Sequence, residues 1–237
     1  LLPPVTRLAE EIDPSSDLHR LLFDSSPEAT KDWIEAFLTI PDTRGRIVDF
    51  RTYPQQGAML RNHTGRDYTV KGRQTRASSL FLARRVRRVT TSWGLKCLIA
   101  AHDDFTTGLF RARIQHHIRD LANHGMVYKL KVDNDDEMVI DGLESGFVFQ
   151  SGEQRVMGRS FAVLDALISE YAHWKPEKAS ELMGGLLPAV PGPPYGLIDI
   201  ESTPRGAEGD FYEGVLDAQP NNPNSQWSVH FYPWWME

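Results

Sequence analysis

Hydrophobic residues recur at helical spacing in three parts of the chain. In residues 32–38 they form one stripe, and a Ser-Ser-Pro-Glu sequence typical of a helix N-terminus precedes them. Residues 78–91 and 105–121 predict two further helices. The side chains expected to face inward from these two helices are Leu80, Phe81, Ala83 and Val86, then Phe105, Leu109, Phe110, Ile114, Ile118 and Leu121.

The middle helix also carries a run of arginines. Arg84, Arg85, Arg87 and Arg88 are expected to point largely outward. A solvated helix face is the first interpretation, and a surface that faces DNA or a partner is the alternative.

Short apolar runs predict the strands. Residues 68–71, 95–101, 162–169 and 195–200 predict buried strands. Between residues 126 and 149 the apolar positions alternate and polar turns separate them, which predicts short antiparallel strands. Strands that alternate with helices favour an α/β fold with a mostly parallel central sheet flanked by helices.

We divide the chain into three parts. Residues 1–49 are expected to form an N-terminal helical appendage, and residues 50–216 a nucleotide-binding core with a small antiparallel β insertion. Residues 217–237 end on large apolar side chains, and we expect this segment to lead toward a further domain.

Composition narrows the functional classes. The chain has 237 residues, of which 41% are hydrophobic and 24% charged, as in an ordinary globular protein. No apolar run approaches the roughly 20 residues of a membrane helix, and no signal peptide is expected. The single cysteine, Cys97, excludes an internal disulfide framework and agrees with an intracellular setting. A net charge of −6 argues against a generally basic nucleic-acid binder, so any DNA contact is expected to be local.

The stretch from Tyr68 to Leu82 carries the clearest candidate chemistry. A strand-like run leads into a polar turn, and a helix follows. N–H groups and the positive dipole end at a helix N-terminus favour an anion at such a turn, and a serine in the first helical turn can bind Mg²⁺. The candidate phosphate-binding residues are Lys71, Gly72, Arg73, Gln74, Thr75, Arg76, Ala77, Ser78 and Ser79.

This turn departs from the usual phosphate-loop pattern, G-x-x-x-x-G-K-[ST]. With Ser78 as the final hydroxyl, Lys71, Arg76 and Ala77 stand where Gly, Gly and Lys are usual. The one lysine, Lys71, lies at the front of the loop, and a lysine that enters from the preceding strand can reach the same phosphates. A polar surface connection between strand and helix is the alternative interpretation.

Polar side chains also follow the predicted strand 162–169. Because carboxyl ends of parallel strands converge on the ligand crevice of an α/β sheet, Glu170 is a candidate to polarise an attacking water. A carboxylate that caps the next helix is the alternative. Ser169 stands where an aspartate usually precedes this base, and Asp165 is about 13 Å away along a strand, too far to serve the same ion. Either Ser169 holds a metal-bound water or the metal relies on Ser78 and the phosphates.

Two more segments carry candidate nucleotide contacts. The strand 195–200 runs into Glu-Ser-Thr-Pro-Arg-Gly, a sensor-type loop in which Ser202 or Thr203 is expected near the γ-phosphate. A β-turn built on Pro204 and Gly206 is the alternative. Gln56, at the start of a predicted helix, can match an adenine edge with its amide, or it is simply an exposed glutamine.

Three motifs in this order resemble those of one protein family. They are Lys-Gly-Arg-Gln-x-x-x-Ser-Ser, Ser-Glu-Tyr-Ala-His-Trp and Ser-Thr-Pro-Arg-Gly-x-x-x-x-Phe-Tyr. Together with Tyr-Pro-Gln-Gln before them and Gly-Arg-Ser-Phe-Ala ahead of the acidic strand, they resemble the ATPase domain of the large terminase subunit, the DNA-packaging motor of tailed bacteriophages. The resemblance covers about residues 50–212 and implies a P-loop NTPase fold of the ASCE type.

The resemblance implies roles for individual residues. Glu170 matches the catalytic carboxylate, Arg73 a loop arginine that stabilises charge at the γ-phosphate, and Lys71 the front-of-loop lysine of members with a deviant loop. The remaining matches are Ser78 for the Mg²⁺-binding hydroxyl, Gln56 for the adenine reader, Ser202 and Thr203 for the coupling loop, and Arg159 or Arg155 for an arginine finger toward a neighbouring subunit.

The resemblance also implies cofactors and partners. The cofactors are ATP and Mg²⁺, with Ser78 and, through water, Ser169 as metal-side groups. The partners are double-stranded viral DNA, the portal protein and procapsid, the small terminase subunit and further copies of the chain in a ring, in the host cell cytoplasm and without a membrane. The family's nuclease domain would follow this chain, so no nuclease activity is expected here.

Three functions compete on these residues. The first is an ATP-driven motor domain that translocates double-stranded DNA. The second is a degenerate nucleotide-binding module that docks DNA without turnover, as Ala77 and Ser169 suggest. The third is a helicase-like ATPase, which the Ser-Thr-Pro-Arg-Gly motif disfavours.

Overall fold

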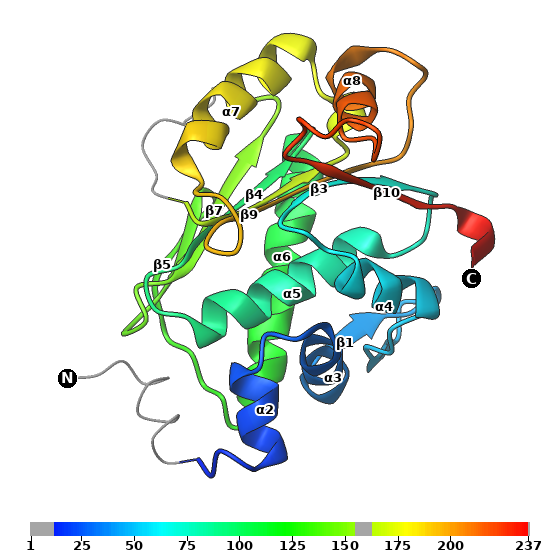
Figure 1. Ribbon diagram of the computed structural model, residues 1–237. Helices are drawn as coiled ribbons and strands as arrows, with labels where there is room; N and C mark the ends of the chain where they lie inside the picture. The colour runs from blue at the N-terminus through cyan, green and yellow to red at the C-terminus, as the bar shows by residue number, and fades with distance from the viewer. Residues whose placement is uncertain (1–11, 155–162, 237) are drawn as a thin grey trace.

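An eight-stranded sheet with helices on both faces forms the centre of the molecule (Figure 1). The computed structural model describes residues 12–154 and 163–236. The strand order is β10-β3-β9-β8-β4-β7-β6-β5, and neighbours run parallel from β10 to β7 and antiparallel from β7 to β5. The strands are β3 (Arg66–Lys71), β4 (Lys96–Ala101), β5 (Leu130–Asp133), β6 (Glu137–Ile140), β7 (Gly146–Ser151), β8 (Asp165–Ser169), β9 (Leu197–Ser202) and β10 (Ser228–Tyr232).

The predicted fold class is therefore confirmed. A mostly parallel sheet forms because helices connect its strands, and the antiparallel part is the short-strand segment expected between residues 126 and 149. The predicted strands 95–101 and 195–200 correspond to β4 and β9.

Helices cover the two faces in two pairs (Figure 1). One face packs against α5 (Ala77–Thr91) and α6 (Asp104–Asn123), and the other lies under α7 (Pro176–Ala189) and α8 (Gly209–Asp217). The buried apolar residues accordingly fall into two clusters. No helix of the described ranges is both long and apolar enough to cross a membrane.

The N-terminal region contains α2 (Asp17–Phe23), α3 (Pro27–Phe37), α4 (Pro54–Arg61) and a hairpin of β1 (Thr39–Pro41) and β2 (Ile47–Asp49). The start of α3 is as expected, because the Ser26 hydroxyl accepts a hydrogen bond of 3.2 Å from the Ala29 N–H. The described part of the predicted appendage, residues 12–49, is not helical throughout. A hairpin follows α3, and Trp33 and Ile34 are fully buried against the α5 side of the sheet.

The C-terminal segment adds a strand to the central sheet. β10 pairs in parallel with β3 from Ser228 opposite Asp67 to Tyr232 opposite Lys71. Part of the segment 217–237, which we set apart from the core, therefore extends the sheet of the core at one edge. The three-part domain division otherwise stays a prediction.

The arginines of α5 are not a solvated face, contrary to expectation. Arg85 is completely buried, Arg84 and Arg87 are nearly so, and only Arg88 keeps a partly exposed side chain. The reason is tertiary: α5 lies between the sheet and the N-terminal helices, so side chains on several of its faces meet other elements. Arg87, for example, donates to the carbonyl oxygen of Leu21 in α2 at 2.8 Å.

The first turns of α6 also differ from the prediction. Phe105 and Leu109 are 75% and 52% exposed, respectively. The buried stripe instead runs through Thr107, Ile114 and Leu121. At 100° per residue, Phe105 lies about half a turn around the helix from Ile114, so one stripe cannot bury both.

Candidate functional site

The loop between β3 and α5 has an unusual backbone. Gln74 and Arg76 adopt left-handed conformations, with φ of 66° and 53°, and Arg76 immediately precedes the first helical residue, Ala77. Non-glycine residues rarely take such conformations, and those that do cluster at functional sites. Successive N–H groups in a loop of this kind, together with the helix N-terminus, form a concavity that favours an anion.

The C-terminal segment fixes the front of this loop. The Gly72 N–H donates to the Tyr232 carbonyl at 3.0 Å, so the loop N–H groups available to an anion begin after Gly72. A Cβ on Gly72 would lie 2.8 Å from the Trp234 backbone nitrogen, so only glycine fits here. Gln55 adds a hydrogen bond of 3.0 Å to the Pro233 carbonyl.

Lys71 brings the predicted catalytic residues together. Its Nζ lies 2.9 Å from Glu170 Oε1 and 3.3 Å from Ser78 Oγ. The front-of-loop lysine thus lies at the start of α5, and its contact with phosphates stays a prediction. The side chain of Ala77, at the position of the usual lysine, is buried in the apolar core.

Charge in this cluster is strongly coupled. Burial alone would lower the pKa of Lys71, but the carboxylates of Glu201 and Glu170 outweigh burial and raise it. Burial alone would raise the pKa of Glu170, but the Lys71 ammonium and hydrogen bonds from Thr203 lower it below its usual value. Both groups are therefore charged at neutral pH.

The predicted coupling loop contacts the predicted base directly. Glu170 follows β8 in a left-handed conformation with φ of 51°, which turns its carboxylate toward the end of β9. Its Oε2 accepts hydrogen bonds from Thr203 Oγ1 at 3.0 Å, the Thr203 N–H at 3.2 Å and Ser202 Oγ at 3.4 Å. The loop that follows β9 thus contacts Glu170 without an intermediate residue.

Sequence reasoning missed Glu201 as a site residue. This carboxylate is fully buried at the end of β9, 2.8 Å from Ser78 Oγ and 2.7 Å from Lys71 Nζ, and it accepts a hydrogen bond from Ser169. The signal was available: an acidic residue at the carboxyl end of a buried parallel strand is the same pattern that selected Glu170.

Gln56 does not present its amide to the surface. It is fully buried; its Oε1 accepts from the Tyr53 N–H at 3.0 Å, and its Nε2 donates to the Arg76 carbonyl at 3.1 Å. Gln56 therefore braces the loop between β3 and α5. Contact with an adenine, which stays a prediction, would require these two bonds to be exchanged.

A surface pocket of about 580 Å³ lies beside the loop. Arg73 lines it, and the Arg76 guanidinium stacks over the Tyr53 ring at 5.5 Å. Ser79 also lines the pocket, and its hydroxyl accepts from Arg113. Thr75, also a residue of this loop, is buried. The two candidate arginine fingers, Arg155 and Arg159, lie outside the described residues.

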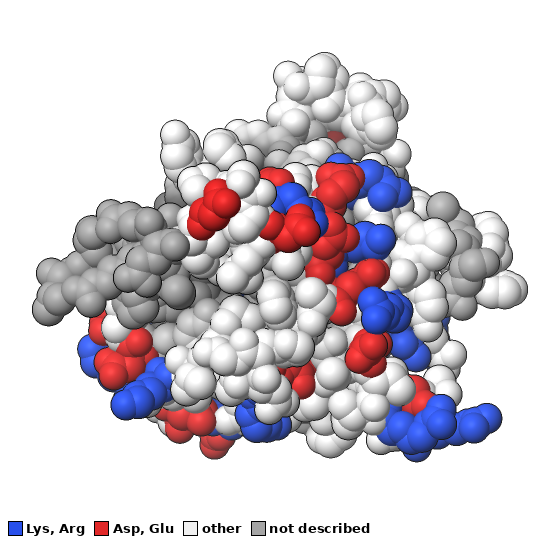
Figure 2. Space-filling model, turned by 90° about the horizontal axis from the view of Figure 1, so that it is seen from below, with Lys and Arg blue, Asp and Glu red and all other residues white. Residues whose placement is uncertain are grey.

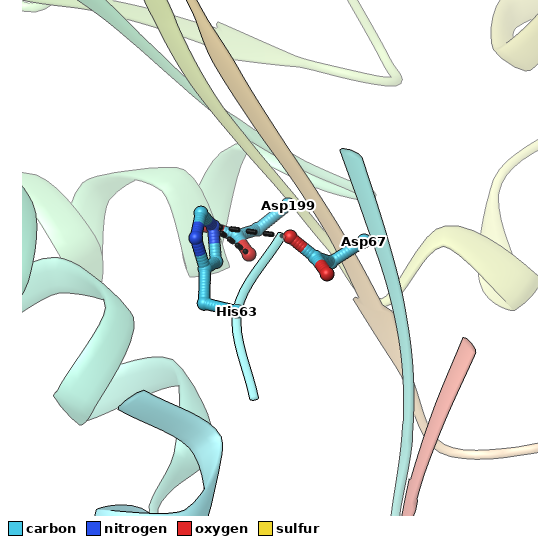
Figure 3. Close-up of side chains that lie close together, drawn as sticks. All are labelled: His63, Asp67 and Asp199. Carbon is cyan, nitrogen blue, oxygen red and sulfur yellow. Dashed lines mark ion pairs between the residues drawn. The ribbon is translucent and has the colours of Figure 1, made fainter. Parts of the chain in front are cut away.

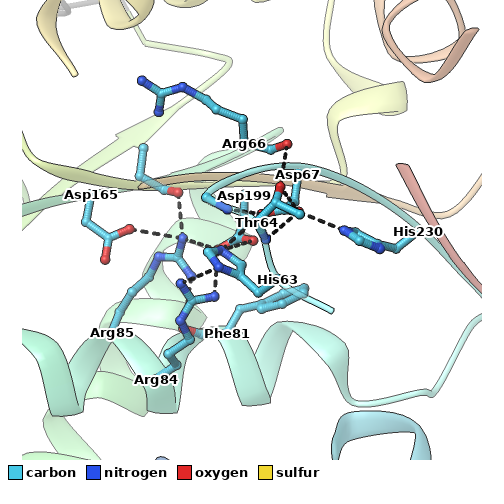
Figure 4. Close-up of polar contacts among 12 residues, drawn as sticks. His63, Thr64, Arg66, Asp67, Phe81, Arg84, Arg85, Asp165, Asp199 and His230 are labelled. Carbon is cyan, nitrogen blue, oxygen red and sulfur yellow. Dashed lines mark hydrogen bonds and ion pairs between the residues drawn. The ribbon is translucent and has the colours of Figure 1, made fainter. Parts of the chain in front are cut away.

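A second polar cluster lies at the opposite, amino end of the same strands. His63 Nε2 is 3.1 Å from both Asp67 Oδ2 and Asp199 Oδ1, a geometry that could hold a metal ion (Figure 3). Figure 4 shows, however, that arginines of α5 already meet Asp199, while His63 and His230 meet Asp67. Arg85 lies 2.6 Å from Asp199 and 3.1 Å from Asp165. We assign this cluster to structure, because arginine cations already lie beside Asp199 and Asp165, and two histidines lie beside Asp67.

No protein-family model matches the sequence, and no curated protein matches it. Solved structures do. The chain is similar to the large terminase ATPase domain of Thermus phage P74-26, at 18% identity and a TM-score of 0.62, over 77% of this chain and 81% of that one. It is also similar to the large terminase of bacteriophage HK97, at 10% identity and a TM-score of 0.69, over 86% of this chain and 43% of that one. The large terminase of a thermophilic bacteriophage also matches, with a TM-score of 0.51 at 13% identity, over 76% of this chain and 44% of that one.

The resemblance drawn from three sequence motifs is thus confirmed at the level of the fold. This chain has the fold of the ATPase domain of phage large terminase subunits.

Proposed function

We propose that this chain is the ATP-hydrolysing motor domain of a viral terminase large subunit, which drives double-stranded DNA into a procapsid. One observation carries the proposal: Lys71, Ser78, Glu170 and Thr203 converge at the carboxyl ends of three adjacent parallel strands, next to the N-terminus of α5. The fold shared with large terminase ATPase domains supports the same conclusion.

The phosphates of ATP would bind at the loop. The N–H groups after Gly72 and the first turn of α5 would donate to phosphate oxygens. Lys71 and the exposed Arg73 would neutralise phosphate charge, and Arg73 would stabilise the charge that develops at the γ-phosphate. Lys71 is paired with Glu170, so attraction of its ammonium to the phosphates would release the base.

Hydrolysis would use Glu170 as the group that accepts a proton. The water oxygen forms a bond to the γ-phosphorus while the bond to the β,γ-bridging oxygen breaks, and the electron pair leaves with ADP. The Glu170 carboxylate orients the water and takes its proton. Thr203 and Ser202 hold this carboxylate, so loss of the γ-phosphate would alter their hydrogen bonds and signal the coupling loop.

The donor set next to the loop fits Mg²⁺. Hydroxyl and carboxylate oxygens are the ligands this ion prefers, and Ser78 Oγ lies within 2.8 Å of a buried carboxylate oxygen, with the Ser169 hydroxyl on the same carboxylate. Ser78, and Ser169 through a water, would hold the ion. Bound there, Mg²⁺ would neutralise charge on the β- and γ-phosphates.

The remaining assignments belong to the same proposal. The partners would be viral DNA, portal protein and procapsid, the small terminase subunit and further copies of this chain in the host cytoplasm, with Arg155 or Arg159 reaching a neighbouring copy. Figure 2 shows acidic and basic side chains intermixed on one face, without a broad basic area among its described residues. That face is therefore not where we place the DNA.

The non-hydrolysing module is the less favoured function. Ala77 was one of its two supports, and Lys71 supplies the ammonium that Ala77 lacks. Turnover decides between the two functions.

The decisive test is Mg²⁺-dependent ATP hydrolysis by the chain, with nucleotide affinity measured alongside, for wild type, Glu170→Gln and Lys71→Ala. Loss of a general base should reduce Glu170→Gln hydrolysis by about 10²–10⁴-fold, while ATP binding is retained. Loss of the ammonium should weaken ATP binding of Lys71→Ala by about 10–100-fold.

Lys175→Ala, an exposed lysine beyond the site, is the control and should behave as wild type. A wild type that binds ATP and never hydrolyses it, even with DNA, would establish the docking module. Hydrolysis by Glu170→Gln at the wild-type rate would show that another residue activates the water.

A further inference from the structure

We propose that Glu201 supplies the carboxylate that position 169 lacks, so that β9, instead of β8, provides the acidic group of the Mg²⁺ site. This inference rests on the proposed function, because it assigns a residue to the metal of that nucleotide site. The assignment concerns a residue that none of the sequence motifs selected.

The register of the sheet places the two positions side by side. β8 and β9 are parallel neighbours, and Ser169 is paired directly with Glu201. Because side chains alternate along a strand, Glu201 shares a face with Asp199, which contacts Arg85 of α5. The side chains of Ser169 and Glu201 therefore both lie on the face of the sheet that packs against α5, the helix that carries Ser78. A carboxylate on β9, at the position paired with Ser169 of β8, therefore also reaches the start of α5.

The contacts of Glu201 are those needed beside a metal-binding serine. Its Oε1 accepts from Ser78 at 2.8 Å, and the Ser169 hydroxyl donates to the same oxygen. Ser169 thus supports the carboxylate that replaces the missing one. Asp165 cannot compete, because it lies at the other end of β8 and pairs with Arg85 and Arg88.

The charge balance favours a cation at this point. Glu170 and Glu201 share the single ammonium of Lys71, at 2.9 and 2.7 Å, and Glu201 is completely buried. Burying a carboxylate is costly unless it is paired, and in the described part of the chain these two carboxylates pair with one ammonium, which leaves a negative charge over. When ATP phosphates attract Lys71, a divalent ion beside Ser78 would restore the balance. Before the nucleotide binds, the Lys71 ammonium therefore neutralises the carboxylate charge that the metal ion would neutralise afterwards.

The test is the affinity of a non-hydrolysable ATP analogue, measured by calorimetry in Mg²⁺ and again in EDTA, for wild type and Glu201→Gln. Wild type should bind more tightly with Mg²⁺. Glu201→Gln should lose about 10-fold or more of that Mg²⁺ enhancement, as is typical for groups that support a metal site, while its affinity in EDTA stays equal or rises. Glu208→Gln, an exposed carboxylate after the same strand, is the matched control and should keep the full enhancement.

A second variant guards against a merely structural effect. In Ser169→Asp combined with Glu201→Gln, the carboxylate moves to the neighbouring position, and the Mg²⁺ enhancement should return. Failure of this double variant to recover would overturn the equivalence of the two positions.

Other outcomes separate the two hypotheses. If wild type binds with Mg²⁺ enhancement and Glu201→Gln does the same, the Glu201 assignment is wrong and the proposed function stands. If Glu201→Gln loses binding in EDTA as well, the residue only holds the loop. If wild type binds no nucleotide under either condition, both the proposed function and the Glu201 assignment are wrong.

Discussion

Acidic side chains lie at both ends of β3, β8 and β9, but the cations that surround them differ between the two ends. At the amino end, Asp67, Asp165 and Asp199 are nearly fully buried and meet the guanidinium groups of α5 and two histidines (Figure 4). At the carboxyl end, Glu170 and Glu201 share one described ammonium, that of Lys71. Among the described residues, Asp165 and Asp199 at the amino end meet arginines, whereas the two carboxylates at the carboxyl end share one ammonium.

This difference separates structure from function better than burial does. Glu201 is as buried as Asp199, so burial alone would class both as structural. The carboxyl end also contains three of the four described non-glycine residues with positive φ, Gln74, Arg76 and Glu170. Uncompensated charge and strained backbone in one place indicate a site that a ligand completes.

The largest effect expected from this comparison is on stability at the amino end. Arg85→Met leaves Asp165 and Asp199 buried without their central cation, and removal of one partner of such a network typically lowers the free energy of unfolding by about 3–5 kcal/mol. Glu170→Gln should lower it by much less, because the Glu170 side chain is 23% exposed and Lys71 keeps Glu201 as its partner at 2.7 Å. Urea unfolding of both variants measures the two losses. Equal losses would mean that the carboxyl end is as structural as the amino end.

The pH dependence of stability should show the same contrast on a smaller scale. Burial would raise the pKa of Asp199, but His63, Arg85 and Arg84 outweigh it and hold this pKa well below the usual value. A carboxyl with a depressed native pKa adds stability above its unfolded pKa, about 3.9, and this contribution is lost as the pH falls toward the native pKa. Wild type should therefore lose stability from about pH 5 downward.

Two variants assign that loss. Asp199→Asn should be less stable than wild type at pH 6, with a gap that narrows on acidification. Glu170→Gln should show a smaller gap of the same sign, since the pKa of Glu170 is lowered less and its carboxylate is partly exposed. Unfolding curves between pH 3 and pH 6 test this, and a wider acid-sensitive gap for Glu170→Gln would reverse the comparison.

The smallest effect concerns the coupling loop. Thr203→Val keeps the shape of the side chain but removes its hydroxyl bond of 3.0 Å to Glu170, a hydrogen bond to a charged group that is typically worth about 1.5–3 kcal/mol. We expect ATP hydrolysis to fall by about 10-fold or more, with nucleotide affinity nearly unchanged. Thr91→Val, whose hydroxyl bonds only within α5, is the control. A loss of affinity in place of rate would mean that Thr203 contacts the nucleotide and does not orient the base.

Much of the site could be predicted because its signals are local. A strand, a polar turn with Lys71 and a helix that begins near Ser78 are adjacent in the chain, and Glu170 and Thr203 each follow a buried strand. Parallel strands bring their carboxyl ends to one edge of the sheet, so this order of motifs implied their convergence. Hydrophobic periodicity fixed the fold class for the same reason, since it is set by neighbours within each element.

The tertiary structure decided what depends on pairing between distant segments. The apolar stripe of α5 alone predicts that Arg85 points to solvent. In the folded protein the sheet places Asp165 and Asp199 beside Arg85, so its side chain is buried. Gln56 turns inward because the loop carbonyl of Arg76, twenty positions later, needs a donor. The position of Glu201 in the site depends on the register of β9 beside β8, which places Glu201 opposite Ser169 and next to Ser78. The sequence determined which elements form and where their polar ends lie, whereas strand order and register, which are long-range interactions, determined which of those polar groups meet.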